Sequence, residues 1–351
     1  MGVKRIIAAV TDDGGIRLVE QDVPPVRAGA VLVEVRRSLI STGTELGGWR
    51  AFARRTGHPA PDVSPRTFGY SNSGVVLEVG VGVDDFAPGD RVASVGAGYA
   101  LHTDYAVVPH NLCVGLPDNV TFDQGAYAML AATAIYALRR GEAEFGEYCA
   151  VAGLGLLGQL TARIHQLAGC FVIGWDLIER RNQIAMGWGI DATALVGAED
   201  EVKATDTFTL GHGLDRGVMA FGEDGTDAFR GLTRSMKVSP DGHPMGIVVV
   251  VGGTTFHYEG GLTNIDIRQA SRTGPGYHDE AWEHGPPYPS VFMRWTTRTN
   301  LELAMRLIQE GKLDVDALTT HTIPLKNLER EIVALIAEPD EMLGVVLQMD
   351  G

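Results

Sequence analysis

The first third of the chain carries short apolar runs, several with alternating polar positions, separated by turn-forming residues. These runs cover residues 30–35, 73–79, 91–95 and 106–108. Glycine and proline clusters lie between them, for example at 80–82 and 88–90. Short strands punctuated in this way predict a small barrel-like β domain over residues 1–125.

The pattern changes near residue 124. The segment 124–140 is long, rich in alanine and free of proline, which predicts a helix. Beyond it, apolar runs typical of strands alternate with helical patterns. We expect strands at 149–152, 171–174, 217–221 and 247–251, and helices at 159–168, 180–186, 229–236 and 300–310. This alternation predicts an α/β domain with a doubly wound parallel sheet and helices on both faces.

A glycine-rich motif follows the expected strand at 149–152 directly and precedes the helix at 159–168. In a G-x-G-x-x-G motif, the first glycine permits a tight turn, the second lets the backbone approach a pyrophosphate, and the third lets the helix pack against the strand. Amide groups at the start of the helix then face the diphosphate. We therefore predict a dinucleotide-binding loop made by Gly153, Gly155, Leu156, Leu157 and Gly158.

An acidic residue ends the next expected strand. Asp176 lies 18 residues after Gly158, close to the spacing of about 20 expected for the acid that holds an adenosine ribose. A carboxylate repels a 2′-phosphate, so NAD is favoured over NADP. Arg180 and Arg181 weaken that preference, and Arg181 is itself a candidate cofactor-binding residue. An αβ turn without a ligand and a solvated acid remain the alternatives.

Composition narrows the classes of partner. Lys and Arg number 29 and Asp and Glu 44, a formal net charge of −15, which argues against binding to nucleic acid or to an anionic membrane. The longest aliphatic run, 247–251, is far shorter than the roughly 20 residues of a membrane span. Cys113, Cys149 and Cys170 are too few and too scattered for a disulfide framework. The N-terminal residues lack a signal-peptide pattern. We expect a cytoplasmic protein that acts on a small molecule.

Four blocks in the order 69–76, 86–92, 133–138 and 320–325 resemble those of the medium-chain dehydrogenase/reductase superfamily, which includes the zinc alcohol dehydrogenases. The resemblance covers nearly the whole chain. It implies a GroES-like β-barrel catalytic domain built from residues 1–125 and 294–351, with a Rossmann domain at 126–293 between them. It also implies an NAD(P)-dependent oxidoreductase, a cofactor-binding role for Thr133, and a homodimer or homotetramer.

The chain departs from the zinc members at their metal ligands. Where they place a cysteine in a C-G-x-D turn, this chain has Thr-Gly-Thr-Glu at 42–45. Tyr70 and Ser71 replace a His-Glu pair, and Met129 stands at the third ligand position. Only Glu45 has the chemistry of a zinc ligand, and it matches an acid that supports the site from outside. The chain is similar to a zinc-lacking subgroup that includes bacteriochlorophyllide dehydrogenase and sugar or cyclitol dehydrogenases, and we predict no metal.

Without zinc, hydrogen-bond donors must stabilise the alkoxide formed during alcohol oxidation. Thr44 stands where the superfamily keeps a proton-relay hydroxyl, and Tyr70 is placed to donate to a carbonyl oxygen. Glu45 is a candidate to orient either group, or to act as a base if burial raises its pKa. We predict Thr44, Glu45 and Tyr70 as the catalytic residues. A packing role for Tyr70 and structural roles for the other two remain open.

Four further residues are weaker candidates. His278 precedes the return to the catalytic domain and is either an acid/base group or part of a solvated loop or a subunit contact. His102 is interpreted as a surface residue or as a residue that supports the site. Arg272 and Arg294 bind an anionic or hydroxyl-rich substrate, or only form ion pairs.

Taken together, these features predict a zinc-independent, NAD(H)-dependent oxidoreductase. It would interconvert a secondary alcohol and a ketone on a sugar, a cyclitol or a small biosynthetic intermediate. One alternative is a reductase of activated C=C bonds of the quinone or enoyl type, against which Asp176 argues because that branch usually prefers NADPH. The other is a catalytically inactive dinucleotide-binding protein.

Overall fold

The computed structural model describes residues 3–10, 16–46, 66–258, 260–261, 263–338 and 340–349. The chain forms two compact units. Unit 1 comprises Met1–Ala132 and Thr273–Gly351, and unit 2 comprises Thr133–Arg272. Unit 1 therefore contains both ends of the chain, and unit 2 is one continuous segment inserted between the two parts of unit 1.

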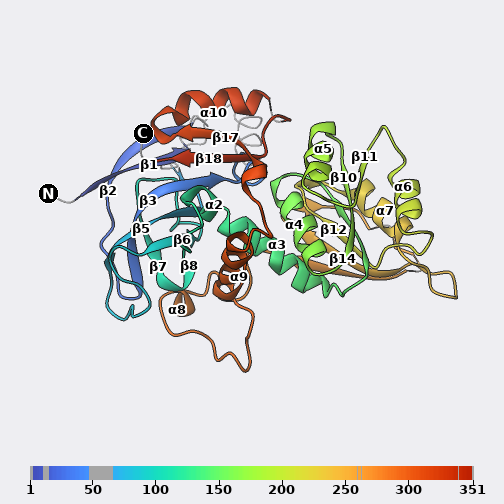
Figure 1. Cartoon of the computed structure of the whole chain (residues 1–351), viewed down its shortest axis with the longest axis horizontal. Helices are drawn as coiled ribbons and strands as arrows, with labels where there is room; N and C mark the ends of the chain where they lie inside the picture. Colours follow the sequence, from blue (N-terminus) through green and yellow to red (C-terminus); the bar gives the residue numbers. More distant parts are fainter. Residues whose placement is uncertain are drawn as a thin grey trace. The chain divides into compact units, whose positions relative to one another are not determined.

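Unit 1 is mainly β-structure (Figure 1). Its strands are β1 (Lys4–Val10), β2 (Ile16–Asp22), β3 (Ala30–Ile40), β4 (Arg66–Thr67), β5 (Ser71–Val79), β6 (Arg91–Val95), β7 (Tyr105–Pro109), β8 (Cys113–Gly115), β17 (Thr319–Pro324) and β18 (Gly344–Gln348). Its described helices include α2 (Phe122–Gly125), α8 (Glu280–Glu283), α9 (Thr297–Gln309) and α10 (Leu328–Ala337), and α3 (Ala128–Gly141) spans the boundary between units 1 and 2 in the sequence.

The main sheet of unit 1 joins the two ends of the chain. Its order is β17-β18-β3-β5-β6-β8, with β7 also paired to β3. Strand β18 runs antiparallel to β3, so that Val345 lies opposite Ile40. Alternate residues of β3, including Val31, Val33 and Val35, are buried, as expected for a strand with one face on a core. The predicted small β domain is confirmed, and strands from both ends of the chain contribute to its main sheet.

Unit 2 is a parallel sheet covered by helices (Figure 1). Its strands are β9 (Tyr148–Ala152), β10 (Phe171–Asp176), β11 (Ala192–Leu195), β12 (Arg216–Met219), β14 (Met245–Val251) and β16 (Asn264–Ala270), and β13 (Glu223–Asp224) pairs with β15 (Thr254–Thr255) apart from them. Its helices are α4 (Leu156–Leu167), α5 (Glu179–Gly187), α6 (Glu201–Phe208) and α7 (Thr226–Ser235).

The order of the parallel sheet, β11-β10-β9-β12-β14-β16, reverses its direction of growth between β9 and β12. Ligands of open α/β sheets bind at the carboxyl ends of the strands where this reversal occurs. Side chains of β9 alternate between two cores: Val151 packs with Ala162 of α4, and Ala150 with Leu232 of α7. The predicted doubly wound sheet is confirmed.

The segment 273–293 packs within unit 1, whereas we expected it in the Rossmann domain. Polar contacts that are not apparent from the sequence hold this segment in unit 1. The side-chain amide of Asn111 donates to the carbonyl oxygens of Trp282, at 2.6 Å, and Gly285, at 2.8 Å. The first boundary lies between Ala132 and Thr133 rather than after residue 125.

The helix predicted at 124–140 is broken into α2 and α3. A Thr121–Gln124 capping box starts α2. At the break, the Ser71 hydroxyl donates to the carbonyl oxygen of Ala126 at 2.7 Å and accepts the amide of Met129 at 3.3 Å. A side chain from β5 thus supplies partners for backbone groups at the break.

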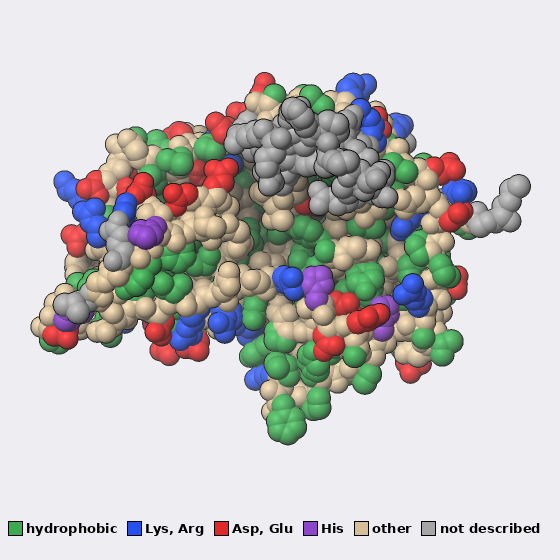
Figure 2. Space-filling view, turned by 180° about the vertical axis from the view of Figure 1, so that it is seen from behind, with side chains coloured by type: hydrophobic (Ala, Val, Ile, Leu, Met, Phe, Trp, Pro, Cys, Tyr) green, Lys and Arg blue, Asp and Glu red, His purple; other side chains and the backbone are tan. Residues whose placement is uncertain are grey.

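The loop between α8 and α9 projects from unit 1 and carries apolar side chains on its surface (Figure 2). Val291 is 82% and Phe292 86% exposed. Among the described residues, no helix combines the length and the apolar character that crossing a membrane requires.

Candidate functional site

The loop between β9 and α4 has the geometry that its glycines predict. Gly153 has φ +90°, which favours glycine, and a Cβ added there would lie 3.0 Å from the Phe221 ring. A Cβ at Gly158 would lie 1.8 Å from the carbonyl oxygen of Gly153. The protein itself therefore requires glycine at both positions, one for the turn and one for the contact between loop and helix.

Gly155 is different, because no described atom of the protein requires a glycine at this position. Its φ of −61° is open to any residue, and no described atom lies within 4 Å of an added Cβ. Gly155 is the N-cap of α4, and its position provides no side-chain acceptor for the helix amides. An open space beside uncapped amides at a helix N-terminus suits an anion. This part of the loop can hold a diphosphate.

Asp176, at the end of β10, lies against the same loop. Its Oδ2 accepts the amide of Leu154 at 2.6 Å, and its Oδ1 accepts the amide of Ile178 at 2.8 Å. The side chain is only 5% exposed, and Nη1 of Arg181 lies 3.6 Å from Oδ2. Two backbone bonds thus fix the carboxylate, while Arg181 offsets part of its charge.

Two buried amide side chains that we did not predict hold this loop in place. Nε2 of Gln159 donates to the carbonyl oxygens of Leu154, at 3.1 Å, and Arg181, at 2.9 Å. Nδ2 of Asn182 donates to the carbonyl oxygen of Asp176 at 3.1 Å. The sequence feature that could have indicated the role of Gln159 is its position within the otherwise apolar start of α4. Thr133 lies buried in α3, at the start of unit 2.

In unit 1, strand pairing assembles the predicted catalytic residues. Strand β3 pairs antiparallel with β5, with Ser38 opposite Asn72. The chain that leaves β3 at Ser41 therefore lies beside the chain that enters β5 at Tyr70. The turn after β3 is closed twice: the Glu45 amide donates to the Ser41 carbonyl oxygen at 2.8 Å, and Oε2 of Glu45 accepts the Ser41 amide at 2.6 Å.

The hydroxyl of Tyr70 is the centre of this group. It forms hydrogen bonds with the side chains of Ser41 and Thr44. Burial raises the pKa of the Tyr70 hydroxyl well above its ordinary value, and the negative charge of Glu45 raises it further, although the two hydroxyl partners act in the opposite direction. Tyr70 is therefore a neutral phenol at pH 7 and can donate a hydrogen bond. The structure brings Thr44, Glu45 and Tyr70 together.

His102 is fully buried behind Glu45, so the surface position that we considered for it is wrong. Its Nε2 lies 3.2 Å from Oε1 of Glu45, within ion-pair distance but outside hydrogen-bond alignment. Its Nδ1 lies 2.8 Å from the Ser38 hydroxyl. Glu45 is thus held by the Ser41 amide on one oxygen and faces His102 with the other.

The remaining candidates lie at the surface. His278 is exposed with φ +69°, and its ring meets the Tyr277 ring edge-on, with centroids 4.5 Å apart. Arg272 is exposed at the end of unit 2. The Arg294 guanidinium lies 4.3 Å from the centre of the Trp295 ring. None of these contacts joins the group around Tyr70 directly.

Comparison with known proteins agrees with this architecture. Residues 27–118 match the model of the alcohol dehydrogenase GroES-like domain. The chain is 26% identical to (R,R)-butanediol dehydrogenase of Bacillus subtilis (strain 168), over 81% of this chain and 82% of that protein. It is 25% identical to sorbitol dehydrogenase of Mus musculus, over 89% and 87%. The crystal structure of 2R,3R-butanediol dehydrogenase from Bacillus subtilis has a TM-score of 0.75 at 20% identity, over 99% of this chain and 100% of that chain.

Proposed function

Because the chain belongs to the medium-chain, zinc alcohol dehydrogenase-like superfamily, we propose that it is a zinc-independent, NAD(H)-dependent dehydrogenase that interconverts a secondary alcohol and a ketone. Its substrate would be a sugar, a cyclitol or another small polyol. The similarity to enzymes named for butanediol and sorbitol supports this class.

One observation carries the proposal. Where zinc members of the superfamily hold their metal, this chain has the Tyr70 phenol, hydrogen-bonded to the hydroxyls of Ser41 and Thr44 and backed by Glu45. Hydroxyl donors directed at one point are the groups that stabilise charge developing on a substrate oxygen when no metal does so.

The residues at the metal-ligand positions do not fit zinc. Protein zinc sites use Cys, His and carboxylate ligands. Thr42 offers an aliphatic hydroxyl, Met129 a thioether and Tyr70 a phenol, and none of these is an ordinary zinc ligand. The Ser71 hydroxyl is used at the break between α2 and α3. We therefore derive no step through zinc.

The residues of unit 2 fit a nicotinamide dinucleotide. The open space at Gly155 and the amides of Leu156 and Leu157 would hold the diphosphate. Asp176 would hold the adenosine ribose, and its carboxylate disfavours a 2′-phosphate, although Arg181 beside it reduces that effect. The bound dinucleotide would supply a hydride acceptor for alcohol oxidation and, in its reduced form, a hydride donor for ketone reduction.

The side chains of unit 1 then handle the proton. In ketone reduction, the Tyr70 O–H donates to the substrate oxygen and passes its proton there as the alkoxide forms. The phenolate left behind accepts hydrogen bonds from Ser41 and Thr44, which lower the pKa of Tyr70. Glu45 acts by charge and position, because the Ser41 amide and His102 occupy its surroundings. In alcohol oxidation, the substrate proton goes to a Tyr70 phenolate, so Tyr70 must first lose its own proton to solvent, a step that its raised pKa disfavours.

The direct test is steady-state turnover of polyols with NAD⁺ and NADP⁺ by wild type and Tyr70→Phe. General acid–base groups contribute about 10²–10⁴-fold, so we expect the kcat of Tyr70→Phe to fall at least about 100-fold while its affinity for NADH is unchanged. Tyr105→Phe, on β7, is the matched control. A wild-type kcat in Tyr70→Phe would show that Tyr70 only fills space.

A further inference from the structure

We propose that Tyr277 binds a second hydroxyl of the substrate, next to the reacting carbon, and so makes the enzyme selective for neutral vicinal diols and polyols. The proposal rests on the proposed dehydrogenase function, and it adds the substrate hydroxyl that the same site would recognise.

Two consecutive peptide groups place Tyr277 beside Tyr70. The amide of Gly96 donates to the carbonyl oxygen of Tyr70 at 3.0 Å. The next amide, that of Ala97, donates to the hydroxyl oxygen of Tyr277 at 2.8 Å. One backbone turn after β6 therefore holds the tyrosine that carries the reaction and the hydroxyl of a second tyrosine. In agreement, the charge of an ionised Tyr277 would raise the pKa of Tyr70.

The segment that carries Tyr277 is built firmly into unit 1. We call residues 273–285 the strap. Gly276 has φ +95°, and an added Cβ would lie 2.5 Å from the Trp282 ring, which is 2% exposed. Nδ2 of Asn300, on α9, donates to the carbonyl oxygen of Thr273 at 2.7 Å. These contacts anchor both sides of Tyr277, so its hydroxyl is held in place before a substrate arrives.

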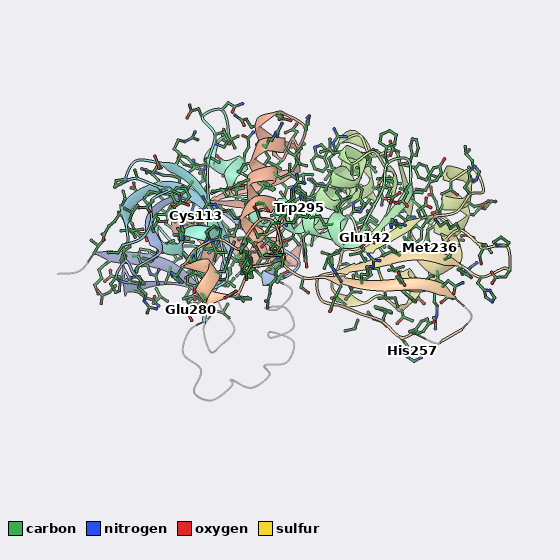
Figure 3. All side chains as sticks on the ribbon, turned by 90° about the horizontal axis from the view of Figure 1, so that it is seen from below. Cys113, Glu142, Met236, His257, Glu280 and Trp295 are labelled. Carbon is green, nitrogen blue, oxygen red and sulfur yellow. The ribbon has the colours of Figure 1, made fainter. Side chains whose placement is uncertain are left out.

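Figure 3 marks Glu280, on the helix α8 within the strap, and Trp295, just before α9. The strap brings Asp279, Glu280 and Glu283 with it, so its charge is negative. The negative charges of the strap and of Glu45 repel anions, so they disfavour a phosphorylated or carboxylated substrate. A phenol is both a donor and an acceptor and is half-buried here, which suits a neutral hydroxyl group.

The test compares 2,3-butanediol with 2-butanol, which has the same reacting group but lacks the second hydroxyl. Wild type, Tyr277→Phe and Tyr99→Phe are assayed with NAD⁺. Tyr99 is the matched control, because it lies two residues from Ala97 but its hydroxyl faces Glu283. A lost hydrogen bond to an uncharged group predicts a rise of up to about tenfold in KM for the diol. We expect kcat within about twofold of wild type, unchanged kcat/KM for 2-butanol, and no effect of Tyr99→Phe.

The outcomes separate the two proposals. An equal change for both substrates in Tyr277→Phe, or no change for either, would overturn the role of Tyr277 and leave the dehydrogenase function intact. Absence of turnover of both alcohols, and of a wider polyol panel, by the wild type would overturn the proposed function and this inference with it. Thermal unfolding of the variants, with midpoints close to that of the wild type, excludes misfolding as the cause.

Discussion

The substitution Gly155→Ala separates cofactor binding from folding. The backbone of Gly155 has φ −61°, and the added methyl group would meet no described atom within 4 Å. Alanine restricts the unfolded chain more than glycine, so the free energy of unfolding should stay constant or rise by about 0.4–1 kcal/mol.

Binding of NADH should weaken, because the methyl group would enter the space into which the diphosphate fits. The loss of one hydrogen bond to a charged phosphate oxygen costs about 1.5–3 kcal/mol. The Kd for NADH should therefore rise by about 10- to 150-fold.

Calorimetric titration with NADH and urea-induced unfolding measure the two effects on the same protein. Gly158→Ala is the comparison, because its methyl group would lie 1.8 Å from the Gly153 carbonyl oxygen. It should lose about 1–3 kcal/mol of stability from overpacking. A Gly155→Ala protein that binds NADH as tightly as the wild type would refute the placement of the diphosphate at this loop.

Two further predictions concern unit 2. Asp176→Ala should weaken NAD⁺ binding about tenfold and reduce discrimination against NADP⁺, as measured by titration with both dinucleotides; unchanged affinities would refute its role. Burial lowers the pKa of His165 from 6.5 to about 4, so the unfolded chain takes up the proton first. Stability should therefore fall by about 3 kcal/mol between pH 6.5 and 4. Urea unfolding across that range should show a weaker pH dependence in His165→Gln; identical pH dependence would contradict the assignment.

The parts of the fold that were predictable from sequence are those specified locally. The glycine loop was found because Gly153, Gly155 and Gly158 lie between an apolar run and a helical pattern. The strand β16 was missed because most of its residues, in the sequence NIDIRQA, are polar and partly or fully exposed. Among the described strands it lies at the edge of the sheet and pairs with β14, so no buried apolar run marks it, and the alternation of Ile265 and Ile267 with polar residues is short.

The parts of the site that were not predictable depend on contacts between distant segments. Glu45 faces His102, which lies 57 residues further along the chain, and His102 reaches back to Ser38. Tyr277 meets the Ala97 amide across 180 residues. Residue type alone gave Thr44, Glu45 and Tyr70 as candidates, whereas their supporting residues follow from the pairing of β3, β5 and β6.

The most direct test of a hydroxyl-based, metal-free chemistry is elemental analysis combined with turnover after exhaustive dialysis of the wild-type protein against a zinc chelator. We expect no stoichiometric zinc and an undiminished rate of NAD⁺-dependent polyol oxidation. One zinc ion per chain, with activity lost on chelation and restored by added zinc, would contradict it.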